Sequence, residues 1–210
     1  MPNGLRIDAS TLYTANVRIG VISDTHGVVP AWEKALRLFE GCGLILHAGD
    51  VLYHPPRIQD LAGYRLADFA AALNDSPIPV VIARGNCDSE VYEELLKMPV
   101  QAPYAVVEVE SVRIVVNHGH LLDRTGMISV AKRYGAQVFI SGHTHMPALE
   151  KVEGVVLLNP GSAAVPKFEK DGKPTPSVAI IEDDNIRIVS LDNGEALFEM
   201  GDWRVRIHSW

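Results

Sequence analysis

Two histidines stand one residue apart in the stretch ISGHTHMP, where His143 and His145 lie between a glycine and a proline. Imidazole is the commonest metal ligand in proteins, so such a pair can help to bind an ion. One pair alone is weak evidence, because a lone histidine is more often a hydrogen-bonded structural residue. The pair becomes informative only if other ligand-type side chains occupy comparable places in the chain.

Other ligand-type side chains follow four more apolar segments that have the character of strands. They come directly after residues 17–23, 43–48, 79–83 and 112–117, and the histidine pair follows residues 137–141. Since the carboxyl ends of strands form the edge where α/β proteins build their sites, these side chains are expected to converge. Each of them alone could be a cap or turn residue, but five strand ends share the pattern. The predicted ligands are Asp24, His26, Asp50, Asn86, His118, His143 and His145.

The ligand types narrow the chemistry of the predicted site. Carboxylates, an amide and imidazoles without an obligate thiolate suit Mn²⁺, Fe, Zn²⁺, Co²⁺ or Ni²⁺ and differ from a structural zinc cage. Seven ligands are too many for one tetrahedral ion and fit two ions that share a carboxylate. Two divalent ions with Asp24 and Asp50 would leave a positive site that attracts a hydroxide and a phosphate anion.

The composition indicates one acidic globular domain. The chain has 210 residues, 47% of them hydrophobic, and a formal net charge of −7. We expect an N-terminal extension over residues 1–16 and a single domain over 17–210. The acidic balance argues against stable nucleic-acid binding. No signal peptide or membrane-length apolar run is evident and there are only two cysteines, so a cytoplasmic protein without membrane contact is expected.

Apolar periodicity predicts strands and helices in alternation, followed by a strand-rich part. Strands are expected at 17–23, 43–49, 79–85, 104–110, 112–118, 136–142, 155–159, 177–183 and 186–192, and helices at 30–40, 66–73, 89–97 and 127–135. A tight turn is expected near Glu110 and Ser111, and a surface loop over 166–176. This order predicts an α/β fold with two packed mixed sheets and helices outside. The apolar residues of 196–210 suggest a docked tail or a contact in a homodimer or homotetramer.

The ordered set D-x-H, GD, GN, H and GHxH resembles the calcineurin-like metallophosphoesterase superfamily. The stretches SDTHG, GDVLYHPPR, ARGNCDSE, NHGHLL, GHTHMP and LNPGSAAVPK are most similar to its YfcE-type bacterial phosphodiesterases, within the small Vps29-like group, from about Val17 to Leu191. The resemblance implies a four-layer α/β/β/α sandwich of two mixed β-sheets with helices on the outer faces. It also implies two divalent ions, usually Mn²⁺, with Zn²⁺, Fe²⁺ or Ni²⁺ as alternatives.

Carried over to this sequence, the resemblance divides the ligands between the two ions. It gives Asp24, His26 and His145 to the first ion, Asn86, His118 and His143 to the second, and Asp50 to both. The implied function is a metal-dependent phosphodiesterase that hydrolyses small phosphodiesters by attack of a metal-bridged hydroxide at a dinuclear site. The alternatives are a non-catalytic Vps29-like interaction scaffold and a phosphomonoesterase or phosphoprotein phosphatase with the same site. The complete ligand set favours an enzyme.

The sequence departs from the superfamily at one place. Many members have GNHD or GNHE, where the histidine protonates the leaving group, whereas this chain has GNCD with Cys87 in that place. A thiol with an ordinary pKa of about 8.5 is a poor substitute for imidazole. Candidates near the leaving group are therefore His120, Asp88 and Cys87 itself, and His54 and Arg57 are candidates for substrate contact. His47, inside an apolar strand, is expected to be a hydrogen-bonded core residue.

Overall fold

The computed structural model describes residues 18–53 and 61–204. Within these residues the strands form a seven-stranded sheet, a five-stranded sheet and a small two-stranded hairpin. The predicted extension over residues 1–16 lies outside the described part. Among the described helices, none is both long and apolar enough to cross a membrane.

The seven-stranded sheet has the order β14-β13-β12-β1-β2-β3-β4. Its parallel half consists of β1 (Ile19–Ile22), β2 (Leu44–His47), β3 (Val80–Ala83) and β4 (Val100–Gln101). Its antiparallel half consists of β12 (Ser177–Glu182), β13 (Asn185–Ser190) and β14 (Ala196–Gly201). The inner strands are continuous apolar runs because both faces of this sheet are covered.

The five-stranded sheet has the order β5-β6-β7-β9-β8. It consists of β5 (Ala105–Val109), β6 (Val112–Val116), β7 (Val138–Ile140), β8 (Pro147–Val152) and β9 (Val155–Pro160). The three central strands are parallel, and the two edge strands pair antiparallel to their neighbours. Glu110 and Ser111 join β5 to β6 with φ values of 50° and 66°, which confirms the predicted tight turn.

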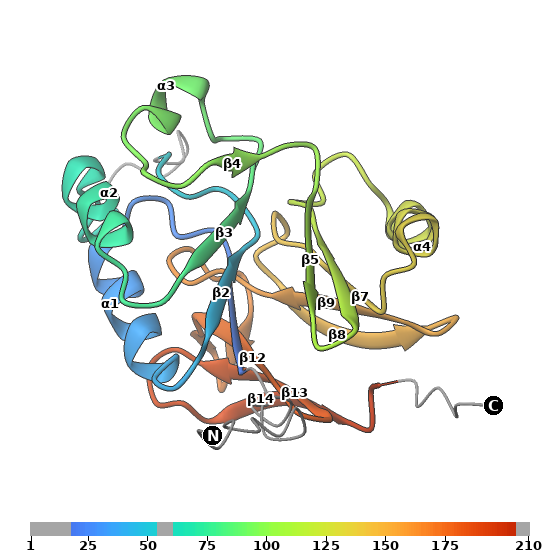
Figure 1. Cartoon of the computed structure of the whole chain (residues 1–210). Coiled ribbons are helices and arrows are strands. Elements are labelled where there is room, and N and C mark those ends of the chain that lie inside the picture. Colours follow the sequence, from blue (N-terminus) through green and yellow to red (C-terminus); the bar gives the residue numbers. More distant parts are fainter. Residues whose placement is uncertain (1–17, 54–60, 205–210) are drawn as a thin grey trace, which may run out of the picture.

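The helices cover the outer faces of the two sheets. Helices α1 (Val29–Leu38) and α2 (Leu66–Asn74) lie on the seven-stranded sheet, and α4 (Arg124–Tyr134) lies on the five-stranded sheet (Figure 1). Pro30 lies in the first turn of α1, where its missing N–H is no loss. Asp123 caps α4 by accepting a hydrogen bond from Gly126, and Gly135 ends the helix in the left-handed region.

Three apolar clusters lie between successive layers. One joins α1 and α2 to the seven-stranded sheet and includes Trp32 and Phe69. A second lies between the two sheets and includes Leu46, Val116 and Ile140. The third joins α4 to the five-stranded sheet. Three clusters between four layers confirm the predicted α/β/β/α sandwich of mixed sheets.

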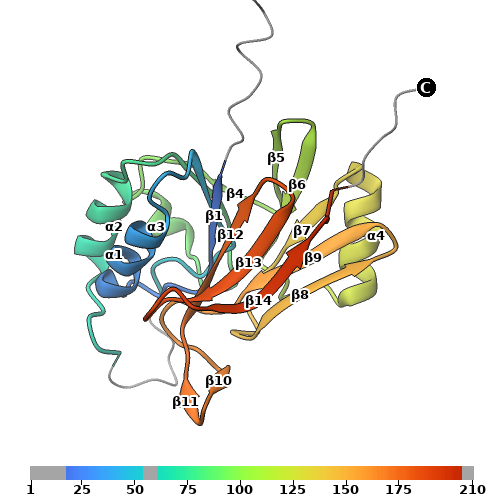
Figure 2. The same cartoon turned by 90° about the horizontal axis from the view of Figure 1, so that it is seen from below.

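Three expected segments differ from the structure or gain detail from it. The helix predicted over 89–97 is only α3 (Glu90–Glu93), because the following residues form turns ahead of Pro99, which disfavours helix in the residue before it. The loop predicted over 166–176 contains a hairpin of β10 (Glu169–Lys170) and β11 (Lys173–Pro174), which projects from the body of the molecule (Figure 2). The apolar residues from Ala196 dock as β14 against β13.

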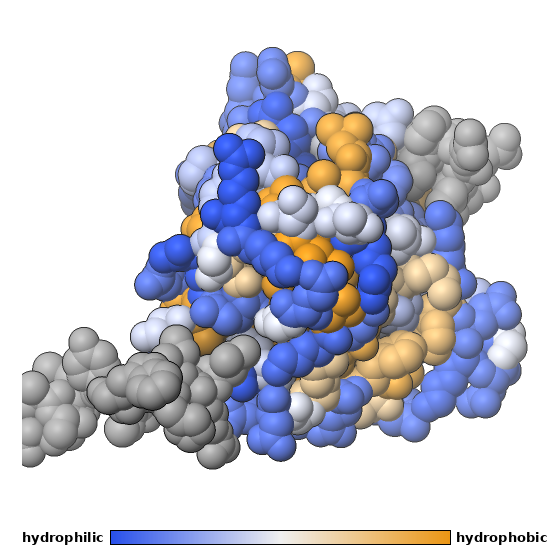
Figure 3. All heavy atoms as spheres, turned by 90° about the vertical axis from the view of Figure 1, so that its right-hand side faces the viewer, coloured by the Kyte–Doolittle hydropathy of each residue, from blue (hydrophilic) through white to orange (hydrophobic). Residues whose placement is uncertain are grey.

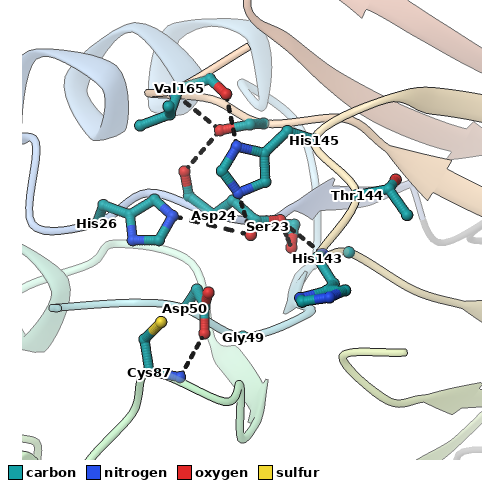
Figure 4. A network of polar contacts seen from close by, with 12 residues as sticks. Ser23, Asp24, His26, Gly49, Asp50, Cys87, His143, Thr144, His145 and Val165 are labelled. Atoms are coloured by element: carbon teal, nitrogen blue, oxygen red, sulfur yellow. Dashed lines mark hydrogen bonds and ion pairs between the residues drawn. The ribbon is translucent and has the colours of Figure 1, made fainter. Parts of the chain in front are cut away.

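A hollow of about 290 Å³ lies between α4 and the outer strands of the five-stranded sheet. Leu122, Met127 and Leu157 contribute to its apolar lining. Arg124 and Glu150 also line it and form an ion pair of 2.8 Å. Figure 3, which looks at this side, shows hydrophobic surface enclosed by hydrophilic side chains. The hollow lies on the far side of the GHTH loop from the two histidines, because Thr144 points away from them (Figure 4).

Candidate metal centre

The predicted ligands come from the loops that follow β1, β2, β3, β6 and β7. The three strands of the first sheet are mutually parallel, as are β6 and β7, so the ends of each set lie together. Backbone hydrogen bonds join the loops themselves, from Asp24 to the Gly49 carbonyl and from Gly142 to the His118 carbonyl, both 3.0 Å. The strand-end pattern therefore brings residues far apart in the sequence to one place.

Two overlapping groups of side chains in this place could each hold an ion. Asp24, His26 and His145 offer ligand atoms within 4.8 Å of one another, and so do Asp24, Asp50 and His118. Figure 4 shows the rings of His26 and His145 turned toward Asp24, with Asp50 below them. The first group is the set that the resemblance gives to one ion. Asp24 belongs to both groups, whereas the resemblance gives the shared position to Asp50.

The two remaining predicted ligands lie beside the second group. The ring of His143 is 5.2 Å from that of His118. Asn86 precedes Cys87, whose backbone N–H donates to Asp50 Oδ1 at 2.9 Å. Asn86 also donates from Nδ2 to Cys87 Sγ at 3.2 Å. The structure thus brings five of the seven predicted residues into the two ligand groups and places His143 and Asn86 next to members of them. The role of all seven as ligands, and their division between two ions, stays a prediction.

Three of the histidines are oriented by the same device. In each ring Nδ1 faces a backbone carbonyl oxygen: His26 faces Tyr53 at 2.7 Å, His118 faces Ala48 at 2.8 Å, and His145 faces Val165 at 2.6 Å. A carbonyl can only accept, so Nδ1 carries a hydrogen, and in the uncharged ring Nε2 keeps its lone pair. This arrangement is typical of metal-ligating histidines. The three Nε2 atoms are thereby prepared to coordinate.

Buried polar atoms without a hydrogen-bond partner mark the same centre. They include Asp24 Oδ1, His26 Nε2 and His118 Nε2. Ionisable groups of the centre itself lie close to two of them: His145 Nε2 is 3.1 Å from Asp24 Oδ1, and Asp50 Oδ2 is 3.3 Å from His118 Nε2. The other Asp24 oxygen, Oδ2, accepts hydrogen bonds from Ser23 Oγ at 2.6 Å and from the His143 N–H at 3.1 Å. Leaving buried polar atoms unsatisfied is costly, and their convergence fits a ligand set for a divalent cation.

The backbone is strained where it presents the ligands. Asp24, His26, Asp50, His143 and His145 all have φ between 46° and 66°, in the left-handed region that non-glycine residues rarely adopt. Each such residue costs of order 1 kcal/mol or more and persists only where its surroundings determine it. Sharp left-handed bends turn the side chains inward directly after the strands end.

Burial and the charged groups of the centre shift the pKa values of its side chains. Burial alone would raise the pKa of Asp50, but His118 and the Cys87 N–H lower it well below its usual range. Burial would likewise lower the pKa of His118, yet Asp50, 3.3 Å away, and Asp24 raise it to about 8. Burial lowers the pKa of His26 and His143. His118 is therefore the histidine that must lose a proton before it can bind an ion at neutral pH.

The raised pKa of His118 predicts a pH-dependent contribution to stability in chelator-treated protein. A group whose folded pKa of about 8 exceeds an unfolded value of about 6.5 stabilises the fold fully below 6.5, and this contribution is lost as the pH rises through 8. The difference in unfolding free energy between the wild type and His118→Gln should therefore shrink by about 1–2 kcal/mol from about pH 6 to pH 8. Urea denaturation at both pH values measures it.

The difference in unfolding free energy between the wild type and His118→Gln isolates the contribution of His118. A histidine with a lowered pKa shows the opposite trend, because its contribution to stability increases as the pH rises over this range. His120→Gln is the matched control. Burial and the nearby His118 lower the pKa of His120. The difference in unfolding free energy between the wild type and His120→Gln should therefore grow as the pH rises. A wild-type-minus-His118→Gln difference that stays constant or grows between the two pH values would contradict the assignment.

The three candidates for the leaving group have different surroundings. Burial and Asp50 raise the pKa of Cys87 to about 12, which makes its thiol a weaker acid than expected. Asp88 accepts three backbone N–H groups, from Asp50 at 2.9 Å, Val51 at 2.8 Å and Gly85 at 2.8 Å. Both of its oxygens are thus occupied in holding two ligand loops together, which argues against Asp88 as an acid. His120 lies against His118 and His143 and stays the candidate.

Other residues hold the ligand loops without facing an ion. Asn159 Nδ2 donates to the Gly142 carbonyl at 2.8 Å and to Thr144 Oγ1 at 3.1 Å. Ser162 Oγ donates to the Asp24 carbonyl at 2.9 Å. Both residues belong to the stretch NPGS within LNPGSAAVPK, for which the sequence alone predicts no role. The motif was visible in the sequence, but its hydrogen bonds to two ligand loops were not.

His47 is confirmed as a buried core histidine. Its Nδ1 accepts the Gly49 N–H at 3.1 Å and its Nε2 donates to Thr25 Oγ1 at 2.9 Å. Burial lowers its pKa to about 3, so it stays neutral. His54 and Arg57, predicted to contact substrate, lie outside the described residues.

Comparisons with known proteins show the family and the fold of this chain. The model of the calcineurin-like phosphoesterase superfamily domain matches residues 17–185. Phosphodiesterase YfcE of Escherichia coli K12 is 36% identical over 173 residues, which cover 81% of this chain and 90% of that protein. The solved structure of E. coli YfcE matches with a TM-score of 0.77 at 32% identity, covering 88% of this chain and 99% of that one. Vps29 of Entamoeba histolytica complexed with Zn²⁺ shares the fold, with a TM-score of 0.62 at 20% identity over 89% of this chain and 99% of that one.

Proposed function

Because the chain belongs to the calcineurin-like phosphoesterase superfamily and is a homologue of phosphodiesterase YfcE, we propose that it hydrolyses small organic phosphodiesters with two divalent metal ions. The observation that carries the proposal is the convergence of Asp24 Oδ1, His26 Nε2 and His118 Nε2 as buried atoms without hydrogen-bond partners. They belong to two overlapping ligand groups, which supports two neighbouring ions rather than one.

The residues of the centre would form two sets of ligands, one for each ion. Asp24, His26 and His145 would hold one ion, and Asn86, His118 and His143 the other. Asp50 stands beside His118 and is fixed by the Cys87 N–H, so it is well placed to contact both ions. When bound, divalent ions supply an acidified water as nucleophile and neutralise charge on the phosphoryl oxygens. Mn²⁺ is the proposed native ion, since an oxygen and nitrogen ligand set accepts it.

The proposed preference for diesters with good leaving groups rests on the leaving-group side of the centre. Cleavage of an ester with a poor leaving group needs a proton donor, and a Cys87 thiol with a pKa of about 12 donates poorly at neutral pH. His120 is the nearest other imidazole, with its ring 5.7 Å from that of His118. We therefore expect activated diesters to be cleaved best. The two cysteines are free thiols, which supports action in the cytoplasm.

A paired assay tests this function. The protein is treated with chelator, and Mn²⁺, Zn²⁺, Ni²⁺ or Mg²⁺ is then restored separately. Release of p-nitrophenol is measured from bis-p-nitrophenyl phosphate and from p-nitrophenyl phosphate. We expect chelation to lower diester cleavage by a factor of more than about 100 and Mn²⁺ to restore it, with the monoester cleaved more slowly.

The other outcomes of this assay distinguish the alternatives. Faster cleavage of the monoester would identify a phosphomonoesterase that uses the same centre. No cleavage with any ion, in protein that still binds metal by calorimetry, would favour a non-catalytic scaffold with the Vps29-like fold. Cleavage that survives chelation and replacement of His143 by alanine would reject the metal centre as the site of reaction.

A further inference from the structure

A cavity of about 380 Å³ opens directly beside the metal centre. Residues that line it include Arg84, Asn86, Pro103, Asn117, His120 and Leu121. Two of them belong to the centre itself, because Asn86 is a predicted ligand and the ring of His120 is 6.1 Å from that of His143. The volume lies within the range of small-molecule sites. A molecule bound at the centre can therefore extend into this cavity.

One wall of the cavity is tied to a ligand-bearing strand end. Asn117, which precedes His118, donates from Nδ2 to the Pro103 carbonyl at 2.6 Å and accepts the Gly119 N–H at 2.8 Å. The backbone N–H of Arg84 likewise donates to Gln101 at 2.8 Å. These bonds fix the position of the Pro103 wall relative to His118. The cavity is thus a preformed feature of the centre.

The charged groups of the lining already have protein partners. The Arg84 guanidinium pairs with Glu93 and lies 3.8 Å from Glu90. The Asp88 carboxylate is occupied by its three backbone N–H donors. The remaining lining includes the apolar side chains of Ala102, Pro103 and Leu121. Such a lining favours an uncharged group with apolar surface.

Leu121 gives a second reason to expect an apolar ligand. Its side chain is 82% exposed at the edge of the cavity, the highest value among the large hydrophobic residues that are exposed in the described part. Pro103 and Ala102 are exposed as well. Apolar surface gathered at the mouth of a site is typical of a place that a ligand covers.

We propose that this cavity binds the ester group that a phosphodiester retains after cleavage, and that it favours an uncharged ring such as an aryl group. The inference rests on the proposed function. In an in-line displacement the attacking and leaving oxygens lie on opposite sides of phosphorus, so the retained ester group projects sideways. The cavity shares Asn86 and His120 with the centre, so a retained ester group that projects sideways from a phosphate bound there can reach it.

Two diesters with the same leaving group test the proposal. Phenyl p-nitrophenyl phosphate and methyl p-nitrophenyl phosphate both release p-nitrophenol and differ only in the retained ester group. The measured quantity is the ratio of kcat/KM for the phenyl ester to that for the methyl ester. Ala102→Trp should fill the cavity and lower this ratio by about tenfold, the effect of losing the burial of one ring. Leu121→Ala, at a highly exposed position that leaves folding intact, should lower it by about threefold.

Ala196→Trp is the matched control for the larger substitution. Ala196 is exposed on β14, at the opposite edge of the seven-stranded sheet from β4, which Ala102 follows. This variant should keep the wild-type ratio. The intrinsic difference in reactivity between the two esters is the same for every variant, so it cancels when the ratios are compared. A ratio that is the same in the wild type, Ala102→Trp and Leu121→Ala would overturn the cavity assignment while leaving the proposed function in place. Failure of the wild type to cleave either diester would reject the proposed function and this inference with it.

Discussion

Asp24→Asn is expected to abolish phosphodiester cleavage and to remove metal binding, with a loss of activity on the order of 1000-fold. Asp24 belongs to both candidate ligand groups, and it is fully buried with its Oδ1 only 3.1 Å from His145 Nε2, another candidate ligand. Loss of a residue that merely supports a ligand typically costs about 10- to 100-fold, and a direct ligand of two groups should cost more. An amide also removes one negative charge from a centre that must neutralise cations.

Two measurements separate loss of the ion from loss of the fold. Isothermal calorimetry with Mn²⁺ should show weaker binding in Asp24→Asn, while circular dichroism should show a folded protein. Asp192→Asn makes the same change in charge at a side chain that is 55% exposed and pairs with Lys34. This control should keep both activity and metal affinity. Undiminished Mn²⁺ affinity in Asp24→Asn would be incompatible with the candidate centre.

The positions of the candidate ligands in the fold could be predicted from the sequence, because a strand end fixes the position of the residue that follows it. A short apolar run followed by Asp, Asn or His places that residue at the carboxyl edge of a sheet, whatever the rest of the chain does. The parallel pairings of β1, β2 and β3 then bring Asp24, Asp50 and Asn86 to one edge. Pairing of β6 with β7 does the same for His118 and His143. Local pattern and topology therefore agree at this site.

The supporting contacts could not be predicted, because they depend on which loops meet in three dimensions. The sequence offered Asp88 as an acid near the leaving group. Its three hydrogen bonds to the backbone of two other strand-end residues and of Gly85 appear only after folding. The same holds for the three carbonyl groups that orient His26, His118 and His145. Side-chain identity carries little information about such backbone partners.

Some short strands and strands at the edges of sheets could not be predicted from the pattern of apolar residues in the sequence. Strand β4 has two residues, and β10 and β11 lie in a polar, proline-bearing stretch without apolar alternation. Their pairing is decided by neighbouring strands and by the turn at Asp171 and Gly172, both of which have positive φ. In contrast, the inner strands of the two sheets were predicted. Helices cover one face of each sheet and the other sheet covers the opposite face, and burial on both faces demands continuous apolar runs.

The close packing between the loops after β2 and β3 leads to the second large effect. A Cβ atom added at Gly85 would lie 2.1 Å from Asp50 Oδ1 and 2.3 Å from the Asp50 backbone nitrogen. Real Cβ atoms do not approach this closely, so Asp50 must move with its backbone. Gly85 also donates its N–H to Asp88 at 2.8 Å, which holds the two loops in contact. Rotation of the Asp50 side chain could relieve only the first of these contacts, because the second is with the backbone.

Gly85→Ala is therefore expected to lower kcat/KM by about 100-fold, because displacing a catalytic group by about 1 Å can cost that much. Overpacking should also destabilise the protein by about 1–3 kcal/mol, measured by urea denaturation. Gly201→Ala is the matched control, since its added Cβ would meet nothing within 4 Å. It should leave activity unchanged. Wild-type activity in Gly85→Ala would mean that the loops separate without disturbing Asp50, and that its position is not critical. Lost activity with retained stability would instead show that the tight contact between these loops serves the centre rather than the fold.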